Sequence, residues 1–248
     1  MNIYDNYAEI GDGAEIGNSA IIGNLVEIGD YVKIGENVEI GAFAKIGCSA
    51  IIGNYAGIGV HARIGDHAEI GTCMKIGDYA KIGAKAKIGV FANIGDSAEV
   101  GDRAVIGESA RIGNFAEIGD GAEIGARVEI GDLARIGDYT KINDHVEIGD
   151  YAEIGDGVEI GDKFRCEGLK VIDFFTMANV DGTGRKIHVY VHTEGITIRT
   201  GCFKGTLDEF CWQAAQEEKY LYSTTVRAAA EAFAAEVHRQ GKTGGWDK

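Results

Sequence analysis

A short stretch of the chain concentrates the side chains that could bind or transform a small molecule. It contains His61, Arg63, Lys75, Tyr79 and Lys81. Imidazole is a general acid or base near neutral pH, and Lys and Arg hold phosphate or carboxylate through charge-assisted hydrogen bonds. A tyrosine adds a ring and a hydroxyl. These five residues are the candidate ligand site, an anion-binding belt in which His61 is the sole catalytic candidate.

The histidine and the cations of this belt also have simpler explanations, and these alternatives stay open. No carboxylate is evidently placed to orient His61, so packing in an interface explains this side chain as well as catalysis does. The cations and Glu27 stand directly before a repeated Ile, and Glu99 stands before the equivalent Val100. A ladder of opposite charges across neighbouring strands therefore accounts for them too.

A six-residue repeat must position these side chains. From Ile10 to Ile160 every sixth residue, 26 in all, is Ile, with the single exception of Val100. A small or β-branched residue, usually Ala and sometimes Val, stands two places earlier except at Met74, and Gly follows everywhere except at Asn143. Ala-x-Ile is the alternation of a short strand that turns both apolar residues to one side. Such a strand can bury that side only by stacking on copies of itself.

The phrase A-x-I-G-x-x closely resembles the hexapeptide-repeat family, whose pattern is [LIV]-G-x-x-[AVST]-x. The resemblance covers roughly two-thirds of the chain and implies an all-β, left-handed parallel β-helix with three hexads per coil, so that residues 18 apart stack. The left hand departs from the usual right-handed crossover and is taken from the family. The repeated Gly serves either a tight corner or a close approach of backbones, and the sequence leaves both open.

The repeat also sets the predicted domains. Residues 1–163 form the β-helix, and residues 164–248 form a small C-terminal α+β capping domain. Within this domain, residues 164–205 supply strands and residues 206–241 supply two helices. The segment 200–210 resembles a tail found on uncharacterised hexapeptide proteins of phages and prophages, a likeness that implies a phage or prophage origin and no known activity.

The predicted elements of the C-terminal domain follow from local signals. Leu169–Met177 and Ile187–Val191 form a β-hairpin around the turn Asp181–Gly184, with Ile196–Ile198 as a third strand. The first helix opens with the capping box Thr206–Glu209. The second begins near Ser223 or Thr224 and ends at Gly241.

The third residue after each Ile falls at a corner of the expected coil, which gives three columns. In one column seven of nine residues are large and apolar or aromatic, and an exposed stripe of that length marks an interface. Hexapeptide-repeat proteins usually associate as side-by-side trimers, so the resemblance implies a homotrimer. The alternative is that the stripe receives the chain's own C-terminal helix. The predicted interface residues are Tyr7, Leu25, Phe43, His61, Tyr79, Phe115, Leu133 and Tyr151.

The composition of the chain limits the classes of partner and ligand that it is expected to bind. A net charge of −15 disfavours nucleic acid and anionic membranes. The sequence shows no signal peptide or transmembrane run, and its five cysteines lack CxxC spacing, which is typical of reduced thiols in the cytoplasm. His61, His67 and His145 fall in three different columns, so no metal site is expected.

These observations favour a non-catalytic structural or binding module that forms a β-helix homotrimer. The first alternative is a hexapeptide acyltransferase. The resemblance implies that such enzymes use a His near the cleft between neighbouring prisms, and most carry a protruding loop that this repeat lacks. Acyl-CoA is expected only under that alternative, and otherwise no cofactor is. The second alternative is capture of a small anionic, nucleotide-like ligand in the clefts between prisms.

Overall fold

A computed structural model describes residues 7–160, 165–166, 170–178, 180, 186–192, 195–201 and 203–240. The chain divides into two compact units, one of Met1–Glu153 and Glu159–Gly168, the other of Ile154–Val158 and Leu169–Lys248. The predicted domain boundary after residue 163 lies outside the described residues, and so do the hairpin turn Asp181–Gly184 and the predicted helix end at Gly241.

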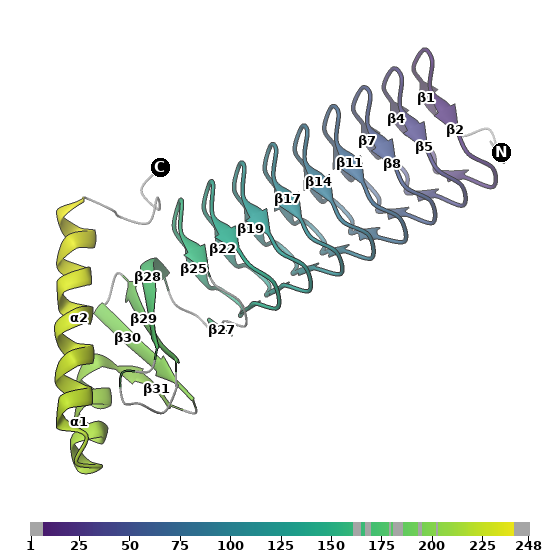
Figure 1. Cartoon of the computed structure of the whole chain (residues 1–248). Helices are drawn as coiled ribbons and strands as arrows, with labels where there is room; N and C mark the ends of the chain where they lie inside the picture. The colour runs from purple at the N-terminus through teal and green to yellow at the C-terminus, as the bar shows by residue number, and fades with distance from the viewer. Residues whose placement is uncertain are drawn as a thin grey trace. The chain divides into compact units, whose positions relative to one another are not determined.

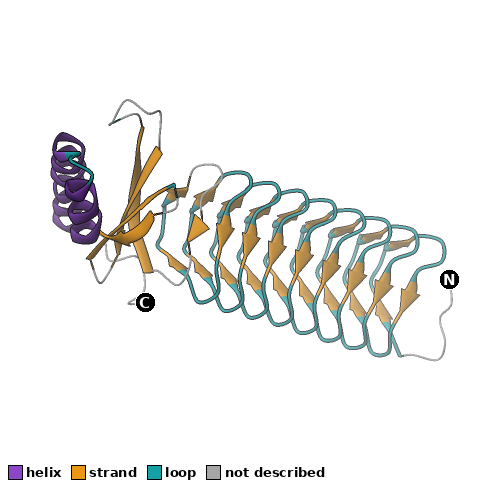
Figure 2. Ribbon diagram, turned by 90° about the horizontal axis from the view of Figure 1, so that it is seen from below, coloured by secondary structure: helices purple, strands orange, loops and turns teal. Residues whose placement is uncertain are grey.

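The repeat folds into coils with three flat faces, each a parallel sheet of two-residue strands (Figures 1 and 2). Strands three apart in the chain are neighbours in a sheet, which puts residues 18 apart in register, as in Arg63 beside Lys81. Face 1 consists of β1 (Glu9–Ile10), β4 (Glu27–Ile28), β7 (Lys45–Ile46), β10 (Arg63–Ile64), β13 (Lys81–Ile82), β16 (Glu99–Val100), β19 (Glu117–Ile118), β22 (Arg135–Ile136) and β25 (Glu153–Ile154).

The other two faces have the same construction. Face 2 consists of β2 (Glu15–Ile16), β5 (Lys33–Ile34), β8 (Ile51–Ile52), β11 (Glu69–Ile70), β14 (Lys87–Ile88), β17 (Val105–Ile106), β20 (Glu123–Ile124), β23 (Lys141–Ile142) and β26 (Glu159–Ile160). Face 3 consists of β3 (Ile21–Ile22), β6 (Glu39–Ile40), β9 (Gly57–Ile58), β12 (Lys75–Ile76), β15 (Asn93–Ile94), β18 (Arg111–Ile112), β21 (Glu129–Ile130), β24 (Glu147–Ile148) and β27 (Arg165–Cys166).

The core of the repeat is the stack of inward residues that the alternation predicts. From Ile22 to Ile160 each inward Ile, and Val100, is at most 5% exposed, and the residue two places earlier, Ala or Val except at Met74 and Thr140, is buried too. Only the first coil departs from this, where Ile10 is 40% exposed. Stability therefore comes from coil-on-coil stacking, in which each strand covers the apolar residues of the next.

The corners are made by residues in the left-handed backbone region. Each described corner residue from Tyr7 to Tyr151 that is not Gly has φ between 50° and 61°. For such residues this conformation costs about 1–2 kcal/mol each. The backbone N–H of the corner residue donates to a carbonyl of the preceding coil, as from His61 to Ala42 at 2.9 Å. These bonds between coils offset the local strain.

The Gly after each Ile serves close approach and not the corner, which decides the question left open by the sequence. A methyl group at Gly59 would lie 2.5 Å from the backbone nitrogen of Asp78 in the next coil. The same clash with the next coil recurs along the array. For Asn143 the residue 18 positions on is 161, outside the described residues.

The acidic surplus at the corners has a structural use. At least twelve Asp or Asn side chains two places after an Ile accept the backbone N–H of the residue 18 positions earlier, as Asp78 does from Val60 at 2.7 Å. These carboxylates and amides satisfy N–H groups that the strand ladders leave out. They are more than a solvated acidic surface.

The C-terminal unit is an antiparallel sheet with two helices. Its strands are β28 (Lys170–Ala178), β29 (Lys186–His192), β30 (Gly195–Thr200) and β31 (Phe203–Thr206), paired in chain order. The predicted hairpin and third strand are present. The strand β31 was not predicted, because its segment FKGT carries no apolar alternation.

The helices are α1 (Leu207–Gln216) and α2 (Tyr220–Arg239). The predicted capping box of α1 is present, with Thr206 and Glu209 bonded reciprocally. The helix α2 begins before the predicted Ser223, because the hydroxyls of Ser223 and Thr224 donate back to the carbonyl of Tyr220 instead of capping the helix start.

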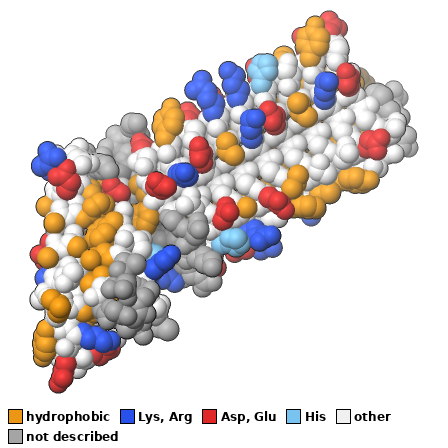
Figure 3. Space-filling model, in the orientation of Figure 1, with side chains coloured by type: hydrophobic (Ala, Val, Ile, Leu, Met, Phe, Trp, Pro, Cys, Tyr) orange, Lys and Arg blue, Asp and Glu red, His pale blue; other side chains and the backbone are white. Residues whose placement is uncertain are grey.

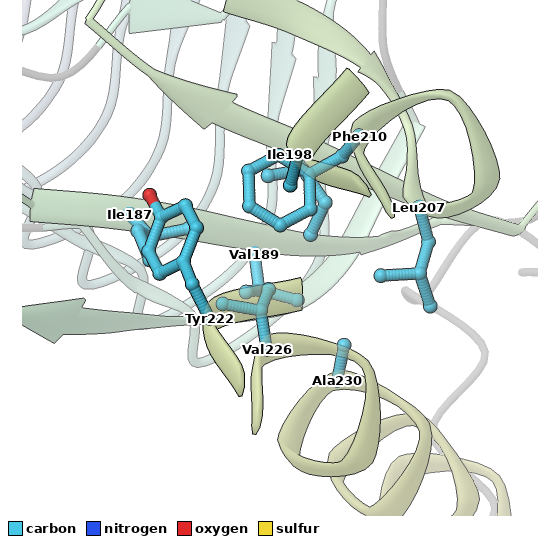
Figure 4. Close-up of a cluster of buried hydrophobic side chains, with 9 residues drawn as sticks. Ile187, Val189, Ile198, Leu207, Phe210, Tyr222, Val226 and Ala230 are labelled. Atoms are coloured by element: carbon cyan, nitrogen blue, oxygen red, sulfur yellow. The ribbon is translucent and has the colours of Figure 1, made fainter. Parts of the chain in front are cut away.

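The core of this unit lies between the sheet and the helices. Figure 4 shows Tyr222 and Val226 of α2 facing Ile187, Val189 and Ile198 of the strands. The rings of Phe210 and Tyr222 meet edge to face, with centroids 5.4 Å apart. No helix among the described residues is long and apolar enough to span a membrane.

Candidate functional site

An open groove runs along face 1 beside the apolar corner column and encloses about 800 Å³. We call it the corner groove. Corner residues form one wall and the outward residues of face 1 form its floor. Its lining consists of Tyr7, Glu9, Leu25, Glu27, Phe43, Lys45, His61, Arg63, Tyr79, Lys81, Ser97 and Glu99.

His61 stands in the middle of the wall, within a stack of rings. Its imidazole lies between Phe43 and Tyr79, with ring centroids 4.7 Å and 4.8 Å apart and nearly parallel planes. The 18-residue register places these corner residues above one another, which explains the stack. In the described part of the chain no carboxylate is hydrogen-bonded to His61, so the stacked rings hold the imidazole in place.

The floor of the corner groove carries three cations in successive strands. Strand register places Lys45, Arg63 and Lys81 side by side, with Glu27 next to Lys45 and Glu99 next to Lys81. Each lysine pairs with its outer glutamate, Lys45 with Glu27 at 2.7 Å and Lys81 with Glu99 at 2.5 Å. Among the described residues Arg63 has no ion-pair partner, because both of its strand neighbours are cations.

Among the described strands, three cations in succession occur on face 1 alone. On face 2 the cations Lys33, Lys87 and Lys141 each pair with a glutamate one strand away. Like charges in adjacent strands repel one another, which the pairing on face 2 avoids. The alternating ladder therefore accounts for face 2, whereas the middle of face 1 departs from it. Figure 3 shows charged and hydrophobic side chains next to one another along the coils.

The structure brings four of the five predicted ligand residues together and separates the fifth. Lys75 lies on face 3, on the other side of the corner column, where it lines a second open groove with Gly57, Val60 and Asn93. The five residues were grouped because they are close in the sequence, but successive strands of a coil lie on different faces. His61, Arg63, Tyr79 and Lys81 share the corner groove.

The groove also contains residues from distant coils that the predicted ligand site did not include. Lys45 was missed altogether, whereas Glu27 and Glu99 were expected only as ladder neighbours of the cations and Phe43 only as an interface residue. All four join the site through the 18-residue register, and the outward residues at that interval are the sequence signal for Lys45.

The predicted interface stripe is exposed in the isolated chain. Exposed fractions run from 43% at Phe43 to 84% at Tyr7 among its apolar and aromatic members. His61 is half-buried. The other two corner columns carry isolated exposed rings, such as Tyr139 in one and Tyr55 in the other. The stripe therefore has the exposure that an interface needs before association.

The two histidines of the strand β29 each contact a threonine. His188 and His192 lie on β29 and meet the hydroxyls of Thr176 and Thr197, both at 2.9 Å. Burial lowers the pKa of His188, and the nearby Lys186 and Arg199 lower it further. Within the described residues no group of three or more His, Cys, Asp or Glu side chains could hold a metal ion.

Coils of this kind, with three parallel faces and left-handed corners, define a class of β-helix proteins built from six-residue repeats. Residues 7–42, 79–114, 103–138 and 127–162 match the family model described as bacterial transferase hexapeptide (six repeats). Residues 7–42 and 79–162 carry the repeats of the hexapeptide-repeat superfamily, and the array is the left-handed parallel β-helix that the sequence predicted.

Solved structures with similar coils include UDP-N-acetylglucosamine acyltransferases. That of Francisella novicida is 24% identical over 64% of this chain and 63% of its own, with a TM-score of 0.33. The LpxA of Acinetobacter baumannii is 24% identical over 64% of each chain, with a TM-score of 0.36. A further UDP-N-acetylglucosamine acyltransferase is 22% identical over 63% of this chain and 66% of its own, with a TM-score of 0.45.

Likenesses of this size say nothing about activity. The match spans less than two-thirds of the length of these acyltransferases, 63% to 66%. No curated protein sequence matches this chain. The likeness of residues 200–210 to phage proteins gains no support from these comparisons.

Proposed function

We propose that this chain is an acyltransferase of the hexapeptide class that holds an anionic substrate in the corner groove. The observation that carries the proposal is the placement of Arg63, which has no ion-pair partner among the described residues, beside the ring stack that contains His61. A guanidinium in a concave site is suited to a phosphate or carboxylate. The match of the repeats to a family model described as a bacterial transferase supports the choice of reaction class.

The proposed chemistry assigns one role to each group. Arg63, with Lys45 and Lys81 on either side, holds the anionic end of a substrate. His61 accepts the proton of an acceptor hydroxyl or amine as that group attacks the acyl thioester. The acyl group passes to the acceptor, and the thiolate leaves and takes up a proton. The ring of Tyr79 limits access to one side of the imidazole.

A pair of substitutions separates binding from chemistry. Arg63→Ala should weaken binding of inorganic phosphate and coenzyme A at least tenfold by calorimetry, and wild-type binding should weaken with added salt. Arg103→Ala removes the same charge from another corner and should leave both affinities unchanged. Equal binding heats for the two variants, or no binding heat from the wild type, would contradict the proposed anion site.

His61→Phe tests the catalytic step, because it keeps a stacked ring and removes the imidazole nitrogens. The wild type should release thiol from acetyl-CoA in the presence of amino and hydroxyl acceptors. The variant should lose that release while keeping phosphate binding. Thiol release at the rate of buffer alone would contradict the acyltransferase proposal.

The second candidate is a binding module without catalysis. It is favoured by the stack itself, since His61 contacts two rings and, among the described residues, donates no orienting hydrogen bond to a carboxylate. A general base is ordinarily oriented by a third group. Phosphate binding without thiol release is the result that supports this candidate.

We also propose that the exposed corner column joins three copies side by side, so that a neighbouring protomer closes the corner groove. Phe115→Asp combined with Leu133→Asp should yield monomers by light scattering with unchanged β signal in circular dichroism. Both residues lie outside the groove and are more than 40% exposed. Burying two charges in an apolar interface is the physical reason.

The matched control is Tyr139→Asp, which changes an exposed ring of another corner and should leave the oligomer intact. If the oligomer survives the double change, the interface lies elsewhere. An oligomeric wild type is itself required, so a monomeric wild type contradicts the proposal. That result would leave the chain's own C-terminal helix as the alternative cover for the column.

A further inference from the structure

The charge pattern along the floor of the corner groove limits the size of the anion that fits. The order along face 1 is Glu27, Lys45, Arg63, Lys81 and Glu99, each one strand from the next. The two lysines are engaged by the glutamates at the ends. The positive charge left for a ligand is therefore centred on Arg63 alone.

We propose that the corner groove selects ligands with a single compact phosphate group and discriminates against extended polyphosphates, with Glu27 and Glu99 as the specificity-determining residues. The inference rests on the proposed anion site and adds the class of anion to it. Both glutamates line the same groove as Arg63. Their carboxylates stand at either end of the cationic run.

The distance between a ligand phosphate and the two glutamate carboxylates determines how strongly they repel each other. Strands lie about 4.8 Å apart, so a phosphate on Arg63 sits roughly 10 Å from the level of either glutamate. That separation exceeds the Debye length of about 8 Å at physiological ionic strength, so the repulsion is largely screened. If a polyphosphate bound along the floor of the groove with its middle on Arg63, its outer phosphates would reach the levels of Lys45 and Lys81. There they would meet carboxylates within the screening length and compete for lysines already paired.

A ligand can displace these glutamates, but only at a cost in affinity. The pairs are about half exposed, with side chains of 51% to 53% exposure. Exposed ion pairs of this kind are weak, so each should reduce polyphosphate affinity by up to roughly fivefold. Two pairs acting together give a discrimination that calorimetry can measure.

The test compares inorganic phosphate with tripolyphosphate on the full chain. Wild type should bind tripolyphosphate no more tightly than phosphate, despite the larger charge. Glu27→Gln combined with Glu99→Gln should strengthen tripolyphosphate binding by up to roughly 25-fold, since both exposed pairs are removed and each contributes up to roughly fivefold. Phosphate affinity should change less than twofold. The control is Glu15→Gln with Glu69→Gln, which removes the same charge from the paired lysines of face 2.

Each outcome of this test bears on the inference. Tripolyphosphate that binds wild type much more tightly than phosphate overturns the size limit while the anion site stands. An equal gain in the face 2 control shows that net charge, and not the two groove glutamates, governs the affinity. Absence of phosphate binding to wild type overturns this inference and the anion site of the proposed function together.

Discussion

Replacing Ile52 by Asp should unfold the coils around residue 52, whereas the same change at Ile51 should leave them folded. Ile52 is 2% exposed and stacks between Ile34 and Ile70, whereas Ile51 is 48% exposed on face 2. A carboxylate among isoleucines finds no partner, and the expected cost is about 3–5 kcal/mol, typical of an unpaired buried charge. A carboxylate at Ile51 stands between Lys33 and Glu69, in solvent.

Hydrogen exchange measures where the damage lies. In a stack of coils stability is close to nearest-neighbour in kind, so Ile52→Asp should lose protection first in β5, β8 and β11. Distant coils and the C-terminal unit should keep theirs. Protection at β8 equal to wild type would contradict the inward assignment of the repeated Ile, as would equal damage from the two substitutions.

The fold of the repeat was predictable because one local rule is applied 26 times without interruption. The alternation of apolar and polar residues determines which residues face inward. Because the repeat has no insertion or deletion, the register between neighbouring strands is the same along the whole array. The purpose of the repeated Gly was not predictable. A corner and a close approach both call for Gly, and only the φ of 59° at His61 and the contact at Gly59 separate them.

The candidate site was predictable in part. The residue types pointed to an anion, and the apolar column pointed to the corner of His61. The separation of Lys75 from Arg63 required knowing which outward residues share a face. The pairing of Lys45 with Glu27 required side-chain geometry, since the 18-residue register alone places Lys45 next to both Glu27 and Arg63.

The C-terminal unit shows a different limit. The capping box at Thr206 and Glu209 predicted the start of α1, because both partners lie within one turn of helix. The start of α2 was wrong in the prediction, since a hydroxyl can either cap a helix or donate to the carbonyl a turn earlier. Thr224 does the second, at 2.9 Å from the carbonyl of Tyr220.

Replacing Gly59 by Ala should strongly destabilise the array, while Gly57→Ala, two residues earlier, should be neutral or slightly stabilising. At Gly59 the added methyl would lie 2.5 Å from backbone atoms of Gly77 and Asp78, and at Gly57 it would meet nothing within 4 Å. Backbone in a hydrogen-bonded coil cannot move aside as a flexible side chain can. The expected cost at Gly59 is about 3 kcal/mol, at the upper end for overpacking.

Urea unfolding of the two variants measures this difference. Gly57→Ala should raise the free energy of unfolding by up to about 1 kcal/mol, because alanine reduces the freedom of the unfolded chain at a position without strain. Gly59→Ala should lower it and expose the coil that contains Asp78. Equal stability of the two variants would mean that coil spacing adapts to a methyl group. The repeated Gly would then have to be explained by something other than the close approach of neighbouring coils.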